Sequence, residues 1–121
     1  MRFRPGHRPG MKRGEIWTVA GGNDYAGKPR PVVILQDDRF DATASVTVCA
    51  FTTDPTDAPL FRIPVQPDER NGLRIPSRLM ADKITTVSRM KLGSRVGVLN
   101  ADDMAQLGRS VILFLGLIET S

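Results

Sequence analysis

Arg30 is the residue of this sequence with the clearest capacity for chemistry. It lies between Pro29 and Pro31, directly before the apolar residues 32–35. Proline fixes its own φ angle and drives the preceding residue into an extended conformation, so Pro31 holds Arg30 extended. A guanidinium keeps its charge throughout the physiological pH range. The pattern therefore places a permanent cation at the rim of a buried strand, where it forms a surface ion pair or serves a functional site.

Other reactive residue types have simpler structural interpretations. Asp37 and Asp38 are adjacent in a polar turn with no further ligand at metal-binding spacing, so we expect a solvent-exposed turn and no metal site. Cys49, the one cysteine, lies inside an apolar strand pattern, where a thiol usually behaves as a small buried hydrophobic group. His7, the one histidine, belongs to a leading stretch rich in proline and glycine, which is typical of a flexible tail.

A glycine-rich loop over residues 20–27 leads directly into Lys28 and Arg30. It contains no Gly-Lys-Ser/Thr followed by a helix, so it is not a phosphate-binding P-loop. We expect it to act as a flap beside Arg30. Tyr25 within it offers an aromatic face on which a base can stack.

The composition predicts one globular domain. The chain has 121 residues and 13.3 kDa, with 40% hydrophobic residues, a net charge of +4 and a pI near 9.8. Three of the positive charges fall within the first ten residues, and from Met11 onward 14 basic residues face 13 acidic ones. Any anion site must then be a local cluster. We expect a flexible tail over residues 1–12, a single domain over 13–121, and a reducing cytoplasmic location, since no secretory signal or membrane-length apolar run is present.

Short strands separated by turns indicate a mostly β protein, a small closed or nearly closed barrel. Pro64 restricts the fourth strand to a sheet edge, and the Asn71-Gly72 pair is a strong turn signal. The expected strands cover residues 14–19, 32–35, 45–51, 60–65, 75–87 (one long or two short strands) and 94–99.

A C-terminal helix follows, with Asn100 as N-cap and two aspartates in its first turn. Its core-facing stripe is expected to be Met104, Leu107, Val111, Phe114, Leu115 and Ile118. Ile112, Leu113 and Leu117 make the final turns apolar on the remaining sides as well. A helix that is apolar nearly all round at a chain end needs a second surface, which predicts a homodimer.

Several segments, in order, resemble the MazF/PemK/Kid family of toxins. They are Arg13-Gly14-Glu15-Ile16-Trp17, the block over residues 27–34, the strand ending in Phe51-Thr52-Thr53, the segment from Ser77 through Met80 and Asp82-Lys83-Ile84, and the apolar C-terminal helix. The resemblance covers about residues 13–118. It implies an SH3-like β-barrel with a C-terminal helix, a homodimer, a metal-independent endoribonuclease acting on single-stranded RNA without cofactors, and an antitoxin protein that neutralises it.

The resemblance also assigns residue roles. The catalytic arginine of the family falls on Arg30 and its threonine on Thr52, while the family's frequent glutamate is replaced here by Tyr25, with Asp24 one residue earlier. The identity of the general base is therefore open. The residues expected to bind substrate are Asp24, Tyr25, Lys28, Thr53, Ser77, Asp82 and Lys83.

The chemistry of these residue types fits RNA cleavage without a metal. The 2′-hydroxyl must attack its adjacent phosphate, and charge that grows on the phosphoryl oxygens must be neutralised. An arginine presents a planar fork to those oxygens, and a threonine hydroxyl adds a neutral donor. Two alternatives remain open, a CcdB-like poison of DNA gyrase and a nucleic-acid-binding SH3-like module without catalysis. The pairing of Arg30 with Thr52 favours the nuclease.

Overall fold

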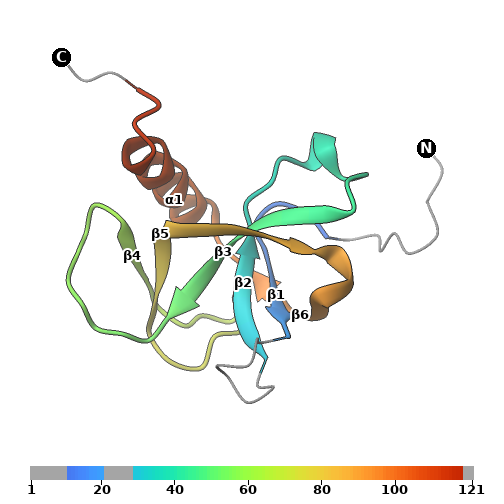
Figure 1. Ribbon diagram of the computed structural model, residues 1–121. Helices are drawn as coiled ribbons and strands as arrows, with labels where there is room; N and C mark the ends of the chain where they lie inside the picture. Colours follow the sequence, from blue (N-terminus) through green and yellow to red (C-terminus); the bar gives the residue numbers. More distant parts are fainter. Residues whose placement is uncertain (1–10, 21–28, 119–121) are drawn as a thin grey trace.

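The computed structural model describes residues 11–20 and 29–118, which form one strongly bent antiparallel sheet and one helix (Figure 1). The elements in chain order are the strands β1 (Glu15–Val19) and β2 (Arg30–Ile34), the 3₁₀ helix η2 (Asp38–Phe40), the strands β3 (Ser45–Thr52), β4 (Arg62–Val65) and β5 (Ser77–Ser88), the 3₁₀ helix η3 (Arg89–Lys91), the strand β6 (Leu92–Val98) and the helix α1 (Ala101–Phe114).

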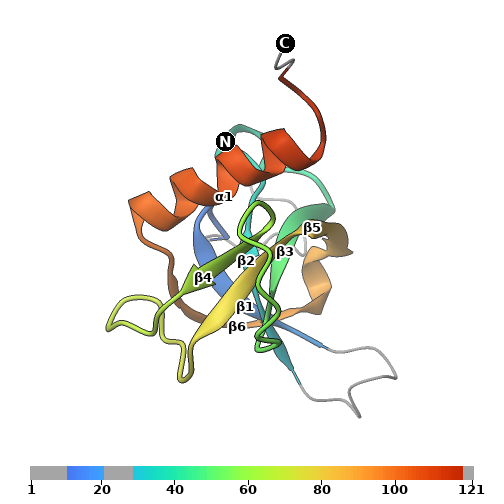
Figure 2. The same ribbon diagram turned by 90° about the vertical axis from the view of Figure 1, so that its left-hand side faces the viewer.

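The sheet has the strand order β4-β5-β3-β2-β1-β6, and every neighbouring pair is antiparallel. Its curvature makes it barrel-like, as expected from the sequence, but β4 and β6 remain outer strands among the described residues, so the sheet is not closed. Helix α1 lies across one side of the sheet over β4 and β5 (Figure 2). Pro64 lies in an outer strand, which confirms the predicted edge position.

Strand β5 carries a large irregularity where it pairs with β3. Cys49 pairs with Ile84, and the next partners are Phe51 and Leu79, so β3 advances by two residues while β5 advances by five. Such a bulge bends the strand and changes which of its side chains face each side. Leu79 and Ala81 enter one core and Met80 faces the other side, as ordinary alternation requires, but the irregularity brings Lys83 to the same side as Met80.

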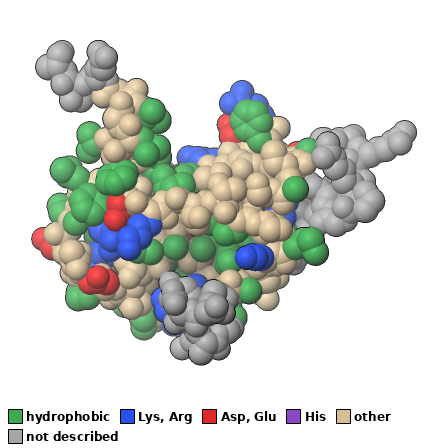
Figure 3. Space-filling model, in the orientation of Figure 1, with side chains coloured by type: hydrophobic (Ala, Val, Ile, Leu, Met, Phe, Trp, Pro, Cys, Tyr) green, Lys and Arg blue, Asp and Glu red, His purple; other side chains and the backbone are tan. Residues whose placement is uncertain are grey.

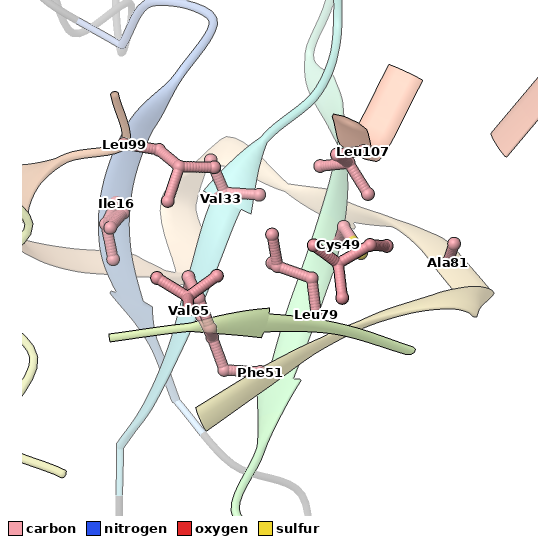
Figure 4. Close-up of a cluster of buried hydrophobic side chains, with 10 residues drawn as sticks. Ile16, Val33, Cys49, Phe51, Val65, Leu79, Ala81, Leu99 and Leu107 are labelled. Carbon is pink, nitrogen blue, oxygen red and sulfur yellow. The ribbon is translucent and has the colours of Figure 1, made fainter. Parts of the chain in front are cut away.

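The sheet has a hydrophobic cluster on each side. The cluster on the helix side contains Leu107 of α1 (Figure 4), together with Ile16, Val33, Cys49, Phe51, Ile63, Val65, Leu79, Ala81 and Leu99. The cluster on the other side contains Met11, Trp17, Val32, Ile34, Val46, Val48 and Leu92. Alternate residues of β2 and β3 enter opposite clusters, because successive side chains of a strand point to opposite faces. The unbroken apolar run after Pro31 is thus covered on both sides, as predicted.

The ends of the domain differ from the sequence-based expectations. Met11 is buried in the second cluster, so the packed structure begins before the expected boundary at residue 13. Helix α1 begins as predicted, with the Asn100 side chain accepting a hydrogen bond from the Asp103 backbone N–H at 2.7 Å. It ends at Phe114, because Gly116 adopts a left-handed φ of 68°, so the predicted continuation of the stripe through Leu115 and Ile118 is wrong.

The turn over residues 66–73 packs closely against the sheet at Gly97 of β6. A Cβ at position 97 would lie 2.3 Å from the carbonyl oxygen of Arg70 and 2.6 Å from the carbonyl carbon of Asn71. These backbone atoms have little room to move, so we expect Gly97→Ala to lower the free energy of unfolding by about 1–3 kcal/mol. Urea denaturation measures this change.

Gly108 of α1 provides the matched control. The nearest atom to its added Cβ lies 4.0 Å away on Arg13, and alanine favours a helix over glycine. We therefore expect Gly108→Ala to be neutral or to stabilise by up to about 1 kcal/mol. Equal effects of the two substitutions would contradict the close approach at Gly97.

Candidate active site

A cavity of about 410 Å³ opens on the side of the sheet opposite α1, across β1, β2, β3 and β5. Apolar side chains form a band across this face of the molecule, with basic side chains beside it (Figure 3). The residues that line the cavity are Val19, Ala20, Arg30, Val32, Val48, Ala50, Phe51, Thr52, Met80, Lys83, Thr85 and Val87. The described residues thus give the cavity an apolar floor, two cations and two hydroxyl groups.

Arg30 is the first residue of β2 and pairs with Val19 of β1. Its backbone is extended, as the flanking prolines predicted, and its side chain is exposed. The β2–β3 register pairs Val32 with Ala50, and continuing it by two residues brings Arg30 opposite Thr52. The two proposed catalytic residues therefore lie on neighbouring strands at the same end of one face of the sheet.

Thr52 ends β3 with its side chain half-buried. Its Oγ1 accepts a hydrogen bond from the backbone N–H of Asp54 at 3.1 Å. A hydroxyl can accept and donate at once, so this contact orients the oxygen while its own proton stays available to a further acceptor. Thr52 is thus suited to donate a hydrogen bond to an anion held by Arg30.

Strand β5 contributes Lys83 and Thr85 from the side of β3 opposite to β2. Thr85 pairs with Val48, and both side chains line the cavity. The part of the lining that the structure describes contains cations and hydroxyl groups but no carboxylate. The electrostatics of the cavity therefore favour an anionic ligand with an apolar part.

Comparisons with known proteins identify the family of this chain. A profile of the family described as PemK-like, MazF-like toxin of type II toxin-antitoxin system matches residues 12–115. The chain belongs to this family of toxins. It is 56% identical over 107 residues to the probable endoribonuclease MazF of Mycolicibacterium smegmatis, covering 88% of this chain and 98% of that protein. It is 30% identical over 117 residues to endoribonuclease MazF9 of Mycobacterium tuberculosis, with the same two coverages, 88% and 98%.

Solved structures of MazF proteins share this fold. Mycobacterium tuberculosis toxin MazF-mt6 superposes with a TM-score of 0.72 at 27% identity, covering 87% of this chain and 99% of that chain. An endoribonuclease in complex with its cognate antitoxin from a mycobacterial species gives a TM-score of 0.73 at 23% identity, covering 90% and 98%. The resemblance read from the sequence is thereby confirmed for the family and for the fold.

The remaining substrate-binding candidates of this MazF-like toxin fall in three places. Asp24, Tyr25 and Lys28 lie outside the described residues. Thr53 is exposed just after β3, and Ser77 is buried, with its hydroxyl donating to the Ile75 carbonyl at 3.1 Å. Neither Thr53 nor Ser77 lines the cavity, whereas Lys83 does. Sequence reasoning missed Thr85, which stands two residues beyond Lys83 on the same strand and could have been found by strand alternation.

Asp82 is engaged by an arginine of the neighbouring strand. Arg62 Nε donates to one carboxylate oxygen at 2.8 Å and Arg62 Nη2 donates to the other at 3.1 Å, with both side chains largely buried. The hydrogen bond from Arg62 holds the pKa of Asp82 below its ordinary value of 3.8. This ion pair joins β4 to β5 next to the bulge, so Asp82 has a structural role in the toxin besides its predicted contact with substrate.

Cys49 is poorly suited to act as a nucleophile at neutral pH. Its side chain is fully buried in the cluster under α1, and its thiol lies 3.3 Å from the Met80 carbonyl oxygen. Burial raises the pKa of the thiol to about 12, so the reactive thiolate is scarce. The sequence-based interpretation of Cys49 as a small hydrophobic core residue fits this environment.

The Arg62–Asp82 pair makes a pH-dependent contribution to stability. Because the folded-state pKa of Asp82 is lowered, this contribution is fully present above the ordinary value of 3.8 and is lost as the pH falls through the folded-state pKa. We expect Asp82→Asn to lower the free energy of unfolding at pH 7, with the difference from the unmodified chain shrinking below pH 3.8. Denaturant titrations at several pH values measure it.

Asp37→Asn is the control for this pH series. Asp37 pairs with Arg39 at 3.1 Å, but these two side chains are 47% and 81% exposed. Exposed pairs contribute little, so we expect a change within about 0.5 kcal/mol at any pH. An Asp82→Asn effect that is equally small, or one that does not vary with pH, would contradict the structural role of the ion pair.

Proposed function

We propose that this MazF-like toxin is a metal-independent, sequence-specific endoribonuclease that cleaves single-stranded RNA at the cavity containing Arg30 and Thr52. The observation that carries the proposal is the placement of these two residues on adjacent strands at the rim of one cavity, together with Lys83. The endoribonuclease names of relatives at 56% and 30% identity support it. They favour this activity over the gyrase poison and the non-catalytic binding module.

In the reaction, the 2′-oxygen bonds to the adjacent phosphorus and the bond from phosphorus to the 5′-oxygen breaks. The products are a 2′,3′-cyclic phosphate and a 5′-hydroxyl, with one proton leaving the 2′-oxygen and one reaching the 5′-oxygen. Negative charge grows on the phosphoryl oxygens, where the planar fork of Arg30 forms charge-assisted hydrogen bonds and Thr52 donates one more. Since both groups stand on strands, little reorganisation is needed at the moment of reaction.

The other proposed contacts position the RNA strand. Lys83 attracts a neighbouring phosphate from the β5 side of the cavity. The other residues proposed to bind substrate around this phosphate are Asp24, Tyr25, Lys28, Thr53, Ser77 and Asp82. We propose that the group that accepts the 2′-proton belongs to the loop before Pro29. Each carboxylate oxygen of Asp82 accepts one hydrogen bond from Arg62 and can accept a second from the RNA, so the proposed contact is compatible with the ion pair.

Cleavage of messenger RNA by such a toxin inhibits translation and growth, and a cognate antitoxin protein neutralises it. The family description names type II toxin–antitoxin systems, and a structural relative is an endoribonuclease in complex with its cognate antitoxin. We place the activity in the cytoplasm, where messenger RNA is translated. In the described part of the chain, no helix has the length and apolarity to span a membrane.

Incubation of the purified protein with mixed RNA in EDTA tests the proposed activity, with discrete cuts ending in a 2′,3′-cyclic phosphate as the expected result. We expect Arg30→Ala to stay folded and to lower the cleavage rate at least about 10²-fold, the effect of removing one preorganised electrostatic donor. Arg30→Lys should not restore the rate, because a point charge lacks the planar fork. Thr52→Ala should lower it less, and Thr52→Ser should recover most of it.

Cys49→Ser is the control for these variants. It places a hydroxyl in the apolar core, so we expect a loss of about 1–3 kcal/mol of stability with an unchanged cleavage rate in the folded protein. If Arg30→Ala cleaved RNA at the normal rate while folded Cys49→Ser did not, the assignment of the site would have to be abandoned. Intact RNA with trapped gyrase complexes would instead support the gyrase-poison alternative.

We also propose that the toxin forms a homodimer through the end of α1. This surface consists of seven large apolar side chains with exposed fractions between 36% and 68%: Leu60, Ile112, Leu113, Phe114, Leu115, Leu117 and Ile118. Phe114 adjoins Phe61, with ring centroids 5.8 Å apart, which connects the helix end to the segment before β4. A contiguous apolar surface of this kind marks an interaction site.

Leu117→Asp tests the homodimer. A carboxylate at the centre of an apolar interface is costly to bury, so we expect this variant to be monomeric at micromolar concentration and less stable in a concentration-dependent way. Sedimentation and thermal unfolding at several concentrations measure both effects. Met90→Asp, at a side chain within η3 that is 84% exposed, serves as the control and should remain dimeric. A monomeric unmodified chain would refute the proposed interface.

A further inference from the structure

We propose that the cavity beside Arg30 binds one nucleobase of the RNA, unstacked from its neighbours, and that Thr85 selects this base by hydrogen bonding. The inference rests on the proposed endoribonuclease function and adds a base-binding subsite to it. Proteins that read single-stranded RNA commonly splay a base out of the stack and contact its edge. The cavity adjoins the position where Arg30 and Thr52 hold the phosphate, which makes this base a neighbour of the scissile bond.

The floor of the cavity suits the flat face of a base. Val32 and Val48 are buried beneath it, and Val19, Ala50 and Val87 pack against the same hydrophobic cluster. A base that lies on this floor removes apolar surface from water. The polar atoms at the edge of the base remain accessible to solvent. At about 410 Å³, the cavity has room for a base together with part of its sugar.

The charges at the rim fit the two phosphates that flank a nucleotide. Arg30 reaches the cavity from β2 and Lys83 from β5, which lie on opposite sides of β3. A nucleotide whose base occupies the cavity presents one phosphate on each side. An apolar side chain of an antitoxin could fill the floor but would bring no anion to the rim, whereas a nucleotide brings two flanking phosphates to the positively charged rim, so the observations favour RNA.

Thr85 is the hydroxyl group nearest the middle of the lining on β5, between Lys83 and Val87. A hydroxyl can both donate to and accept from the edge of a base. Its neighbour Thr86 lies on the other side of the strand, where its Oγ1 is 3.0 Å from that of Thr47. Thr85 and Thr86 therefore provide a matched pair of variants that differ in access to the cavity.

The test measures kcat/KM on an oligoribonucleotide that contains a cut site, and on a series in which each nucleotide near the cut is replaced in turn by an abasic one. Ala50→Leu fills the floor of the cavity from β3. We expect it to lower kcat/KM at least 10-fold on the complete RNA. On the oligonucleotide that lacks the bound base, it should match the unmodified protein, because the lost contact is already absent there.

Thr85→Val removes the hydroxyl with little change of volume. It tests the proposal independently if Ala50→Leu does not fold. We expect it to change the preference among bases at that same position at least 10-fold, while Thr86→Val leaves the preference and the rate unchanged. Equal losses from Ala50→Leu on every abasic substrate would overturn the inference, since the cavity would then only support the catalytic geometry. Unchanged cleavage with weaker antitoxin inhibition would overturn it in favour of an antitoxin side chain.

Failure of the proposed function gives a different result, because the unmodified protein would then cut none of the RNAs. In that case, binding of the four hexameric homopolymers of RNA tests the subsite without cleavage. Weaker binding of at least one of them by Ala50→Leu and by Thr85→Val, but not by Thr86→Val, would support a base-binding cavity. Equal affinities for all variants would overturn it.

Discussion

Strand β5 must serve both sides of the sheet, and the bulge opposite Cys49 and Phe51 allows it to do so. On one side, Leu79 and Ala81 close the cluster beneath α1, and on the other, Met80, Lys83, Thr85 and Val87 wall the cavity. A regular strand would keep odd and even positions on separate faces along its whole length. The bulge therefore brings the cation Lys83 to the face that carries Arg30.

The local features of the site could be predicted from the sequence, whereas those set by long-range pairing could not. The backbone conformation of Arg30 is set by the two prolines next to it, and Thr52 is positioned as the last residue of a strand with alternating side chains. The bulge in β5 depends on pairing with a strand about thirty residues earlier in the chain, so the sequence did not show on which side of the sheet Lys83, and with it Thr85, lies. The same holds for the Arg62–Asp82 pair, which joins two strands. The helix end was misjudged because apolar residues continue past Gly116.

Two acidic residues near the site, Asp54 and Asp82, are held by partners, which lets a nearly neutral domain offer an anion site. Asp82 is paired with Arg62, and Asp54, which follows Thr52 closely, accepts hydrogen bonds from the Thr56 hydroxyl and backbone N–H at 2.7 and 3.0 Å. The hydrogen bond from the Thr56 side chain lowers the pKa of Asp54. Both carboxylates are thus ionised near neutral pH, but they are oriented toward protein donors. The field in the cavity is then set mainly by Arg30 and Lys83.

Cys49 illustrates how the two sides of the sheet are coupled. It stands in β3 at the start of the bulge, with its side chain in the cluster under α1 and its thiol 3.3 Å from the carbonyl oxygen of Met80, whose side chain lines the cavity. A thiol is a weak donor only while protonated, and burial, which raises its pKa to about 12, keeps it protonated at neutral pH. A valine at this position would fill a similar volume but would not donate to the bulge carbonyl. The thiol thus gives the Met80 carbonyl a weak hydrogen-bond donor from β3, a contact that joins the core under α1 to the backbone of the strand that lines the cavity.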